Sequence, residues 1–172
     1  MFRAARIFLA ALTAVTAAGF GLGPGQGGTG VALAQPHMSA GPVMAPFSQT
    51  WRRCDFSKFA YTGPTSYGRV FGQFRVEGGE LVADLQMATG ALNTPYDVRV
   101  IQMPRASASS CNAGDPGVLA ATLFTDGAGS GSVTVRGPIA AGTTGVWASV
   151  TRPSPFSQTP EEFYTTDFVI SK

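Results

Sequence analysis

Apolar and polar positions alternate most regularly over residues 67–88 of the chain. Successive side chains of a β-strand point to opposite faces of a sheet, so this alternation predicts two half-buried strands. The Gly78-Gly79 pair between them tolerates the positive φ angles of a two-residue turn and therefore predicts a β-hairpin. The apolar face of its second strand carries Leu81, Ala83, Leu85 and Met87.

Six further runs have the length and composition of strands, and no helical period persists after residue 35. Short strands separated by turns rich in glycine and proline predict an all-β fold. We expect an antiparallel β-sandwich of about eight strands, because two long loops, residues 104–117 and 153–162, can cross between sheets as in a Greek key. A closed barrel is the alternative. The six runs are Trp51–Tyr61, Tyr96–Met103, Val118–Thr125, Ser132–Arg136, Val146–Arg152 and Phe163–Ser171.

The first 34 residues have the pattern of a secretory signal peptide. Two arginines precede the apolar stretch Ile7–Phe20, and Ala32-Leu33-Ala34 forms a small-x-small cleavage site. The stretch is shorter than the roughly 20 apolar residues that a membrane-spanning helix needs. We therefore expect a secreted protein, extracellular or in the cell envelope, without stable membrane insertion after cleavage. An uncleaved anchor and cleavage after Ala18 are the alternatives.

Residues 35–49 contain three prolines and no period, and they predict a flexible mature N-terminus. The β-sandwich domain is then expected over residues 50–172. The chain has 12 Lys+Arg and 10 Asp+Glu, and because the leader contains two arginines and no acid, the remainder has a net charge of about zero. Its charge gives no indication of nucleic-acid or membrane binding.

The two cysteines, Cys54 and Cys111, both follow the leader. An even count in an exported chain favours a disulfide bond, and two separate buried thiols are the alternative. Long loops without regular structure are uncommon in compact domains unless they are functional or held in place. A Cys54–Cys111 bridge would hold loop 104–117 against the run 51–61.

No residue pattern indicates catalysis or metal binding. The single histidine, His37, falls in the predicted flexible segment, so no Ser–His or Cys–His pair can be held rigidly, and a zinc site lacks ligands. The DGAGSG stretch at Asp126 has one carboxylate where calcium loops use several, and it predicts a turn. The acidic pairs Glu77/Glu80 and Glu161/Glu162 are expected to be solvated charges. We expect a protein that is not an enzyme and needs no metal or cofactor.

One stretch, Trp51-Arg52-Arg53, could form a binding surface because it places an aromatic ring beside two cations. If the predicted disulfide forms, this surface would include the loop that carries Cys111. The alternative is that Trp51 fills the core while the arginines point to solvent. Further aromatic residues that could extend the surface are Tyr61, Tyr67, Phe71 and Tyr96.

Two stretches in the C-terminal half resemble a known group of proteins. They are TLFTDGAGSGSVTVRGPIAAGTTGVWASV (residues 122–150) and PEEFYTTDFVIS (residues 160–171). With the leader and the single cysteine pair, they resemble small exported proteins of actinobacteria, mycobacteria in particular, of unknown function. The resemblance covers most of residues 51–172 and implies an immunoglobulin-like β-sandwich, but it assigns no functional residue.

These observations predict an exported, non-enzymatic β-sandwich protein that binds a protein or a component of the cell envelope. The alternative is a carrier of a small apolar ligand in a cavity between the sheets, and a purely structural envelope protein is a third possibility. A packed interior would argue against a carrier, whereas an apolar cavity of several hundred Å³ would favour one.

Overall fold

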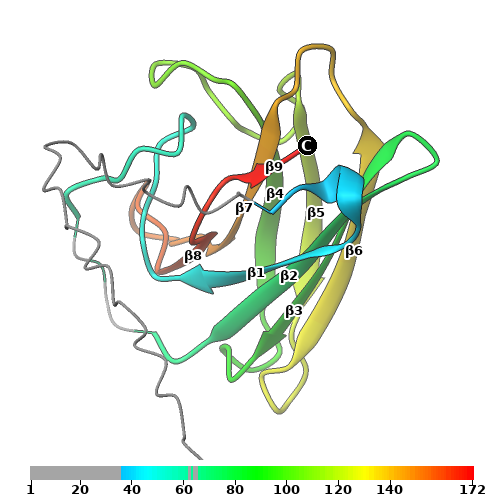
Figure 1. The fold of residues 1–172 in the computed structure, drawn as a ribbon. Helices are drawn as coiled ribbons and strands as arrows, with labels where there is room; N and C mark the ends of the chain where they lie inside the picture. The colour runs from blue at the N-terminus through cyan, green and yellow to red at the C-terminus, as the bar shows by residue number, and fades with distance from the viewer. Residues whose placement is uncertain (1–35, 62, 64–65) are drawn as a thin grey trace, which may run out of the picture. The chain divides into compact units, whose positions relative to one another are not determined.

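The computed structural model of the protein describes residues 36–61, 63 and 66–172, and the predicted leader over residues 1–34 lies outside them. Apart from one short 3-10 helix, η1 (Met38–Ala40), the regular elements of the described chain are strands (Figure 1). No helix among the described residues is long and apolar enough to span a membrane. The strands are β1 (Val43–Ser48), β2 (Arg69–Glu77), β3 (Glu80–Ala88), β4 (Pro95–Met103), β5 (Val118–Phe124), β6 (Gly131–Pro138), β7 (Gly145–Arg152), β8 (Glu162–Thr166) and β9 (Ile170–Ser171).

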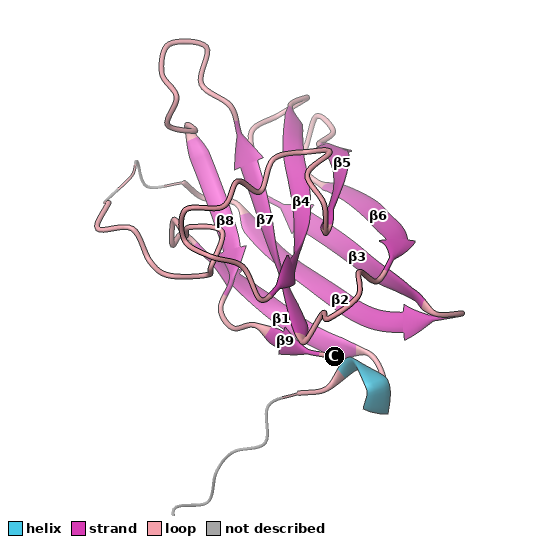
Figure 2. Ribbon diagram, turned by 90° about the horizontal axis from the view of Figure 1, so that it is seen from above, coloured by secondary structure: helices cyan, strands magenta, loops and turns pink. Residues whose placement is uncertain are grey.

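The strands form one continuous antiparallel sheet in the order β5-β4-β7-β8-β1-β2-β3-β6, and β9 pairs with β7 (Figures 1 and 2). The two ends of this order, β5 and β6, lie side by side. At Gly137 of β6 an added Cβ would meet the Leu119 side chain of β5 at 2.6 Å. The sheet therefore curves round on itself and is nearly barrel-shaped.

The expected all-β antiparallel architecture with one disulfide is confirmed, but its immunoglobulin-like form is not confirmed. In immunoglobulin domains two separate sheets face each other, and a disulfide joins them through the core. Here a single strand, β1, pairs with both β2 and β8 and connects the two halves of the sheet. The disulfide joins two loops, and Cys111 packs on a cluster separate from the main core.

The predicted hairpin is confirmed as β2 and β3, with Gly78 at φ 61° and Gly79 at φ 84° in its turn. Glu77 and Glu80 are paired across the turn, as the pattern predicts. Arg136 of β6 contacts both, with nitrogen–oxygen distances of 2.5 Å to Glu77 and 3.1 Å to Glu80. The repulsion between the two carboxylates is therefore offset by a shared cation.

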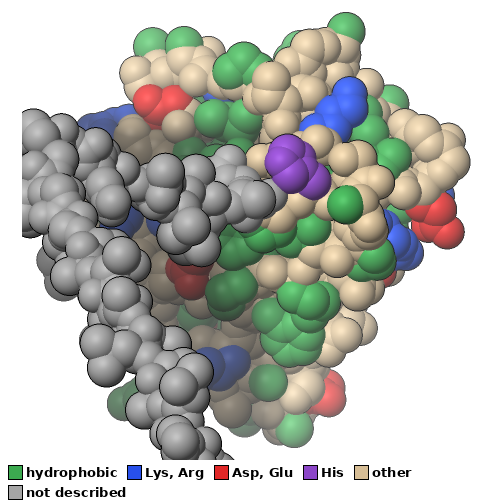
Figure 3. Space-filling view, in the orientation of Figure 1, with side chains coloured by type: hydrophobic (Ala, Val, Ile, Leu, Met, Phe, Trp, Pro, Cys, Tyr) green, Lys and Arg blue, Asp and Glu red, His purple; other side chains and the backbone are tan. Residues whose placement is uncertain are grey.

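The segment predicted as a flexible N-terminus is instead part of the fold from residue 36 onward. Val43–Pro46 pairs with β2, and Phe47–Ser48 pairs with β8. Met38 is buried in the core, and His37 Nδ1 donates to the main-chain oxygen of Lys172 at 3.3 Å; the single histidine lies at the surface (Figure 3). A proline disfavours the interior of a strand because it lacks an N–H donor. Pro46 lies where β1 changes its partner from β2 to β8, so the sheet accommodates the missing N–H.

The strand predicted over Trp51–Tyr61 is also wrong, because this segment is a compact loop. The Phe59 amide donates to the Trp51 carbonyl at 2.8 Å, so the chain turns back within eight residues. Asp55 forms the turn by accepting a hydrogen bond from the Ser57 amide at 3.0 Å, a role for which aspartate is well suited. The final predicted strand, 163–171, is split into β8 and β9.

The inner face of the sheet is filled by one apolar cluster that includes Phe74, Leu85, Tyr96, Val98 and Val100. The outer faces of β4 and β7 are covered as well, which explains why these strands carry apolar residues on both faces. On the outside, Ile101, Val118 and Trp147 form a second, small cluster. Two loops pack over this outer cluster and form the candidate site.

Candidate functional site

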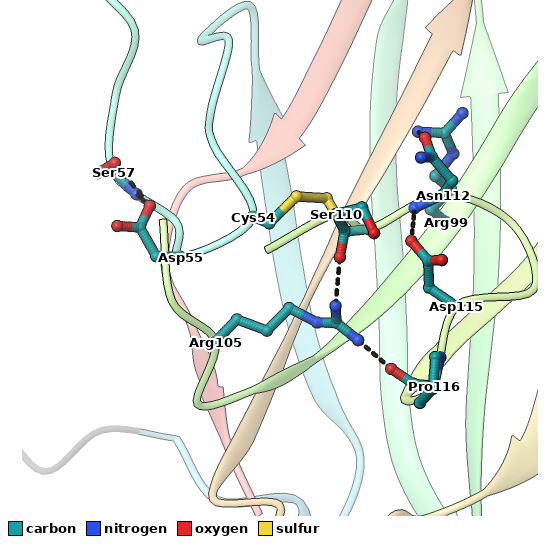
Figure 4. The surroundings of a disulfide bond; sticks show 10 residues. Cys54, Asp55, Ser57, Arg99, Arg105, Ser110, Asn112, Asp115 and Pro116 are labelled. Carbon is teal, nitrogen blue, oxygen red and sulfur yellow. Dashed lines mark hydrogen bonds between the residues drawn. A yellow bond between two sulfur atoms is a disulfide. The ribbon is translucent and has the colours of Figure 1, made fainter. Parts of the chain in front are cut away.

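The Cys54–Cys111 disulfide is confirmed, with a Cα–Cα distance of 5.7 Å (Figure 4). It links the loop that follows β1, residues 49–61, to the loop that follows β4, residues 104–117. We call these the first loop and the second loop. Together they cover part of the outer face of β4, β7 and β8, and the candidate site lies beneath them.

The second loop is held in shape by its own polar groups. The Arg105 guanidinium donates to the main-chain carbonyls of Ser110 and Pro116 (Figure 4). The Asn112 amide donates to the Asp115 carboxylate at 2.6 Å. Hydrogen bonds from Ser110 and from the Asn112 amide keep the pKa of Asp115 below its ordinary value. The loop is long but locally ordered, so it can present fixed side chains.

The first loop is stabilised by two cation–π contacts. The Arg52 guanidinium carbon lies 3.8 Å from the centroid of the Phe56 ring, and that of Arg53 lies 4.1 Å from the Phe59 ring. Arg52 also donates to the Phe56 carbonyl at 3.1 Å. Each arginine is therefore positioned by an aromatic ring of its own loop, which limits how far its charge can move.

A pocket of about 340 Å³ lies between the two loops and the sheet. Its floor includes one row of residues across three strands: Arg99 of β4 pairs with Ser149 of β7, which pairs with Thr165 of β8. Arg52 reaches down from the first loop and donates its Nε to Thr165 Oγ1 at 3.3 Å. The pocket is therefore bounded on one side by strands β4, β7 and β8 and on the other by the two disulfide-linked loops.

One wall of the pocket is aromatic. The Trp51 ring lies 4.9 Å from the Phe59 ring and 6.0 Å from the Phe163 ring of β8, centroid to centroid. Tyr61 packs edge-on against Trp51 at 5.2 Å. Aromatic contacts of this kind contribute about 0.5–1.5 kcal/mol each beyond the area they bury, so this group fixes the first loop on β8.

The pocket is positively charged, because Arg52, Arg53 and Arg99 line it and no aspartate or glutamate does. None of the three makes an ion pair with a carboxylate of the described chain. Burial lowers the pKa of the Arg52 guanidinium below its ordinary value. The site therefore holds three cations, one of them partly desolvated.

Trp147 of β7 also lines the pocket, and it is 2% exposed. Its ring meets the Phe56 ring edge-on, with 5.6 Å between centroids. Its indole Nε1 is buried and has no hydrogen-bond partner in the described chain. An unsatisfied buried donor costs about 1–3 kcal/mol, so this atom marks a position where an acceptor would be stabilising.

The structure places all three predicted site residues, Trp51, Arg52 and Arg53, at the pocket. Of the other aromatic candidates, Tyr61 joins Trp51, but Tyr96 is buried in the interior. Phe71 is exposed on β2 and does not line the pocket. The predicted aromatic patch therefore does not form as one surface.

Six pocket residues on strands were missed, because no local pattern indicates how these strands pair. Each occupies an outward position of β4, β7 or β8, and only the order of these strands brings them together. Two features of the sequence could have indicated them: the charge of Arg99, and the large aromatic rings of Trp147 and Phe163 at outward positions. The six residues are Arg99, Trp147, Ser149, Thr151, Phe163 and Thr165.

Glu162 was expected to be solvated, but it is buried and hydrogen-bonded. Its carboxylate accepts hydrogen bonds from the hydroxyls of Tyr96 at 2.9 Å and Tyr164 at 3.0 Å, and from Arg152 Nε at 2.9 Å. Because these donors occupy its oxygens, the carboxylate has a structural role, holding two tyrosine hydroxyls and an arginine together at one end of the sheet. Burial, reinforced by the Glu162 contact, raises the pKa of Tyr96 to about 12.

The predicted turn at Asp126 is confirmed, and its carboxylate is occupied by the chain itself. Asp126 Oδ1 accepts hydrogen bonds from the amides of Ala128 at 2.8 Å and Ser130 at 2.9 Å. Among the residues that the structure describes, no group of three or more His, Cys, Asp or Glu side chains could hold a metal ion.

A comparison of the chain with family models, with curated proteins and with solved structures found no match.

Proposed function

We propose that this chain is an exported, non-enzymatic binding protein whose contact site for a protein or a component of the cell envelope is the pocket under the Cys54–Cys111 bridge. The observation that carries the proposal is the pocket itself: a volume of about 340 Å³ lined by Trp51, Arg52, Arg53 and Arg99. Arginine and tryptophan are the side chains most enriched where proteins bind their partners.

Export is supported by two independent features. The first 34 residues have the pattern of a signal peptide, and the Cys54–Cys111 bridge is typical of a protein from an oxidising compartment. Without the leader the net charge is near zero. The arginines of the pocket are therefore a local concentration of positive charge and not part of a generally basic surface.

A carrier of a small apolar ligand has less support. Such a ligand would occupy the inside of the sheet, where Phe74, Leu85 and Tyr96 are fully buried in one continuous cluster. The pocket under the disulfide has a polar floor and three cations, which do not suit an apolar ligand.

The proposal is tested by capture from an envelope extract. The purified oxidised protein is immobilised, and the components that it retains are identified and compared with those retained by Trp51→Ala. We expect Trp51→Ala to lose the captured component, because the change removes the centre of the aromatic wall.

Phe156→Ala is the matched control, since Phe156 is 92% exposed in the loop before β8 and does not line the pocket. It is expected to capture as the wild type does. Equal capture by wild type and Trp51→Ala, with both folded by circular dichroism, would show that the contact site lies elsewhere.

A further inference from the structure

We propose that the pocket binds an anionic sugar, an inference that rests on the binding function proposed above. The guanidinium groups of Arg52, Arg53 and Arg99 hold the anionic group, which is a carboxylate or a phosphate. The rings of Trp51 and Phe163 pack against the sugar ring, and the hydroxyl side chains of the pocket bind the sugar hydroxyls.

None of these arginines forms a direct ion pair with a carboxylate of the described chain; Asp167, Asp55 and Asp115 act on Arg52, Arg53 and Arg99 only at longer range. Outside the pocket, Arg75, Arg136 and Arg152 each pair with at least one carboxylate, whereas Arg69 and Arg105 do not. The pocket arginines instead donate to neutral groups: Arg52 to Thr165 and the Phe56 carbonyl, Arg53 to the Lys58 carbonyl, and Arg99 to Asn112. A guanidinium matches carboxylate and phosphate in geometry, so an anion would complete this group.

The rest of the pocket fits a hydroxylated ring. Hydroxyl side chains both donate and accept hydrogen bonds, as sugar hydroxyls do. The negative face of an aromatic ring attracts the C–H groups on the flat side of a sugar. An inorganic anion would use the guanidinium groups alone and leave these groups without a role. The hydroxyl-bearing residues of the pocket are Ser107, Ser110, Ser149, Thr151 and Thr165. Of these, Thr165 already binds Arg52 and the Thr50 carbonyl, and Ser110 binds Asp115.

Size and position favour a sugar over a peptide. A pocket of about 340 Å³ is at the lower end of the roughly 300–1,000 Å³ range of small-molecule sites, which suits one sugar unit with its substituent. Extended peptides commonly add to an open sheet edge. Here the end strands β5 and β6 lie side by side, and the pocket is on a sheet face.

Tryptophan fluorescence tests the proposal directly, because the chain has two tryptophans and both, Trp51 and Trp147, line the pocket. The oxidised protein is titrated at low ionic strength with glucuronate and with glucose 6-phosphate. Glucose, acetate and inorganic phosphate are the comparison probes. We expect a saturable change with at least one charged sugar, and affinities at least about tenfold lower for glucose and for the bare anions.

Each outcome decides the proposal. A preference for glucuronate or for glucose 6-phosphate identifies the anion as carboxylate or phosphate. Equal affinity for a charged sugar and its bare anion would overturn the sugar part. No response to either charged sugar at millimolar concentration would overturn the proposal as a whole.

Arg99→Gln tests the role of the guanidinium on the floor. We expect it to weaken binding of the preferred sugar by about tenfold or more, whereas Arg99→Lys keeps the charge and part of the affinity. Arg69→Gln is the matched control, because Arg69 is exposed on β2 outside the pocket. Thermal midpoints establish that all three variants are folded. Wild-type affinity in Arg99→Gln would contradict the assignment.

A negative sugar titration and a negative capture experiment have different meanings. If wild-type protein captures an envelope component and Trp51→Ala does not, but no charged sugar alters the fluorescence, the binding function stands and the ligand class is wrong. If the capture does not depend on Trp51 either, both proposals are wrong.

Discussion

Arg52 Nε donates to Thr165 Oγ1 at 3.3 Å, a contact that joins the first loop to the central part of the sheet. The same hydroxyl donates to the Thr50 carbonyl at 2.7 Å. Thr165 is 2% exposed, and both bonds are partly shielded from solvent. One hydroxyl group thereby sets both the path of the loop and the position of a pocket cation.

Thr165→Val keeps the shape of this side chain and removes its hydroxyl. We expect it to lower the free energy of unfolding by about 1–3 kcal/mol, because the Arg52 guanidinium loses an acceptor in a partly buried place. Urea denaturation measures the change. Thr122→Val, at an exposed position of β5, is the control and should alter stability by less than about 0.5 kcal/mol. Equal stability of the two variants would contradict the role given to Thr165.

Removal of the disulfide should destabilise the protein and open the pocket while the sheet persists. The bridge closes a loop with a sequence separation of 57, for which the expected loss is about 2–4 kcal/mol. Urea denaturation of the oxidised protein and of Cys54→Ser/Cys111→Ser measures it, with far-ultraviolet circular dichroism for the sheet. Addition of a reductant to the double variant is the control and should change nothing. Two reactive thiols in the denatured, unreduced protein would show that no bridge forms.

Ala45→Asp should prevent stable folding, because Ala45 is 1% exposed in β1, between β2 and β8. An unpaired charge at this point costs more than about 3 kcal/mol. The neighbouring change Met44→Asp places the same charge on the outer face, where the side chain is 54% exposed, and should be tolerated. Thermal unfolding of the two variants gives the comparison. Similar midpoints would mean that β1 is not part of the stable sheet.

Stability should fall in alkaline solution through Tyr96. Burial raises the pKa of Tyr96 in the folded protein to about 12 from the ordinary 10.0, so the contribution is complete below pH 10 and is lost as the pH rises towards 12. Tyr96→Phe removes this dependence, although it also lowers stability at neutral pH by about 1–3 kcal/mol because the Ala91 amide loses its acceptor. The difference in free energy of unfolding between wild type and Tyr96→Phe should therefore become smaller from pH 9 to about pH 11. Urea denaturation measures this difference, and a value that does not change with pH would contradict the prediction.

The fold could be predicted where local patterns decide it. The alternation in β2 and β3 and the Gly78-Gly79 turn correctly predicted a hairpin whose register the structure confirms. β1 was missed because its pairing changes at Pro46, and only distant strands show why a proline fits there. The aromatic residues of the first loop are of a kind common in strands, but in the structure Trp51 packs on Phe59 and on Phe163 and the segment is a loop.

The candidate site could be predicted only where its residues are close together in the sequence. Trp51, Arg52 and Arg53 are adjacent in sequence, and the two cysteines indicated which loop lies beside them. Arg99 and Ser149 are 50 residues apart and meet only because β4 pairs with β7. No local pattern in a single sequence predicts that β4 pairs with β7 in the register that brings Arg99 opposite Ser149.

The position of β1 also constrains when the protein can finish folding. The second half of this first strand has a partner only when β8 (Glu162–Thr166) is present. A chain made from its N-terminus onward therefore holds an incomplete sheet until β8 has been synthesised. If residues 1–34 direct export as proposed and transport begins during synthesis, the chain would enter the channel before the sheet has closed, and the sheet would close on the far side.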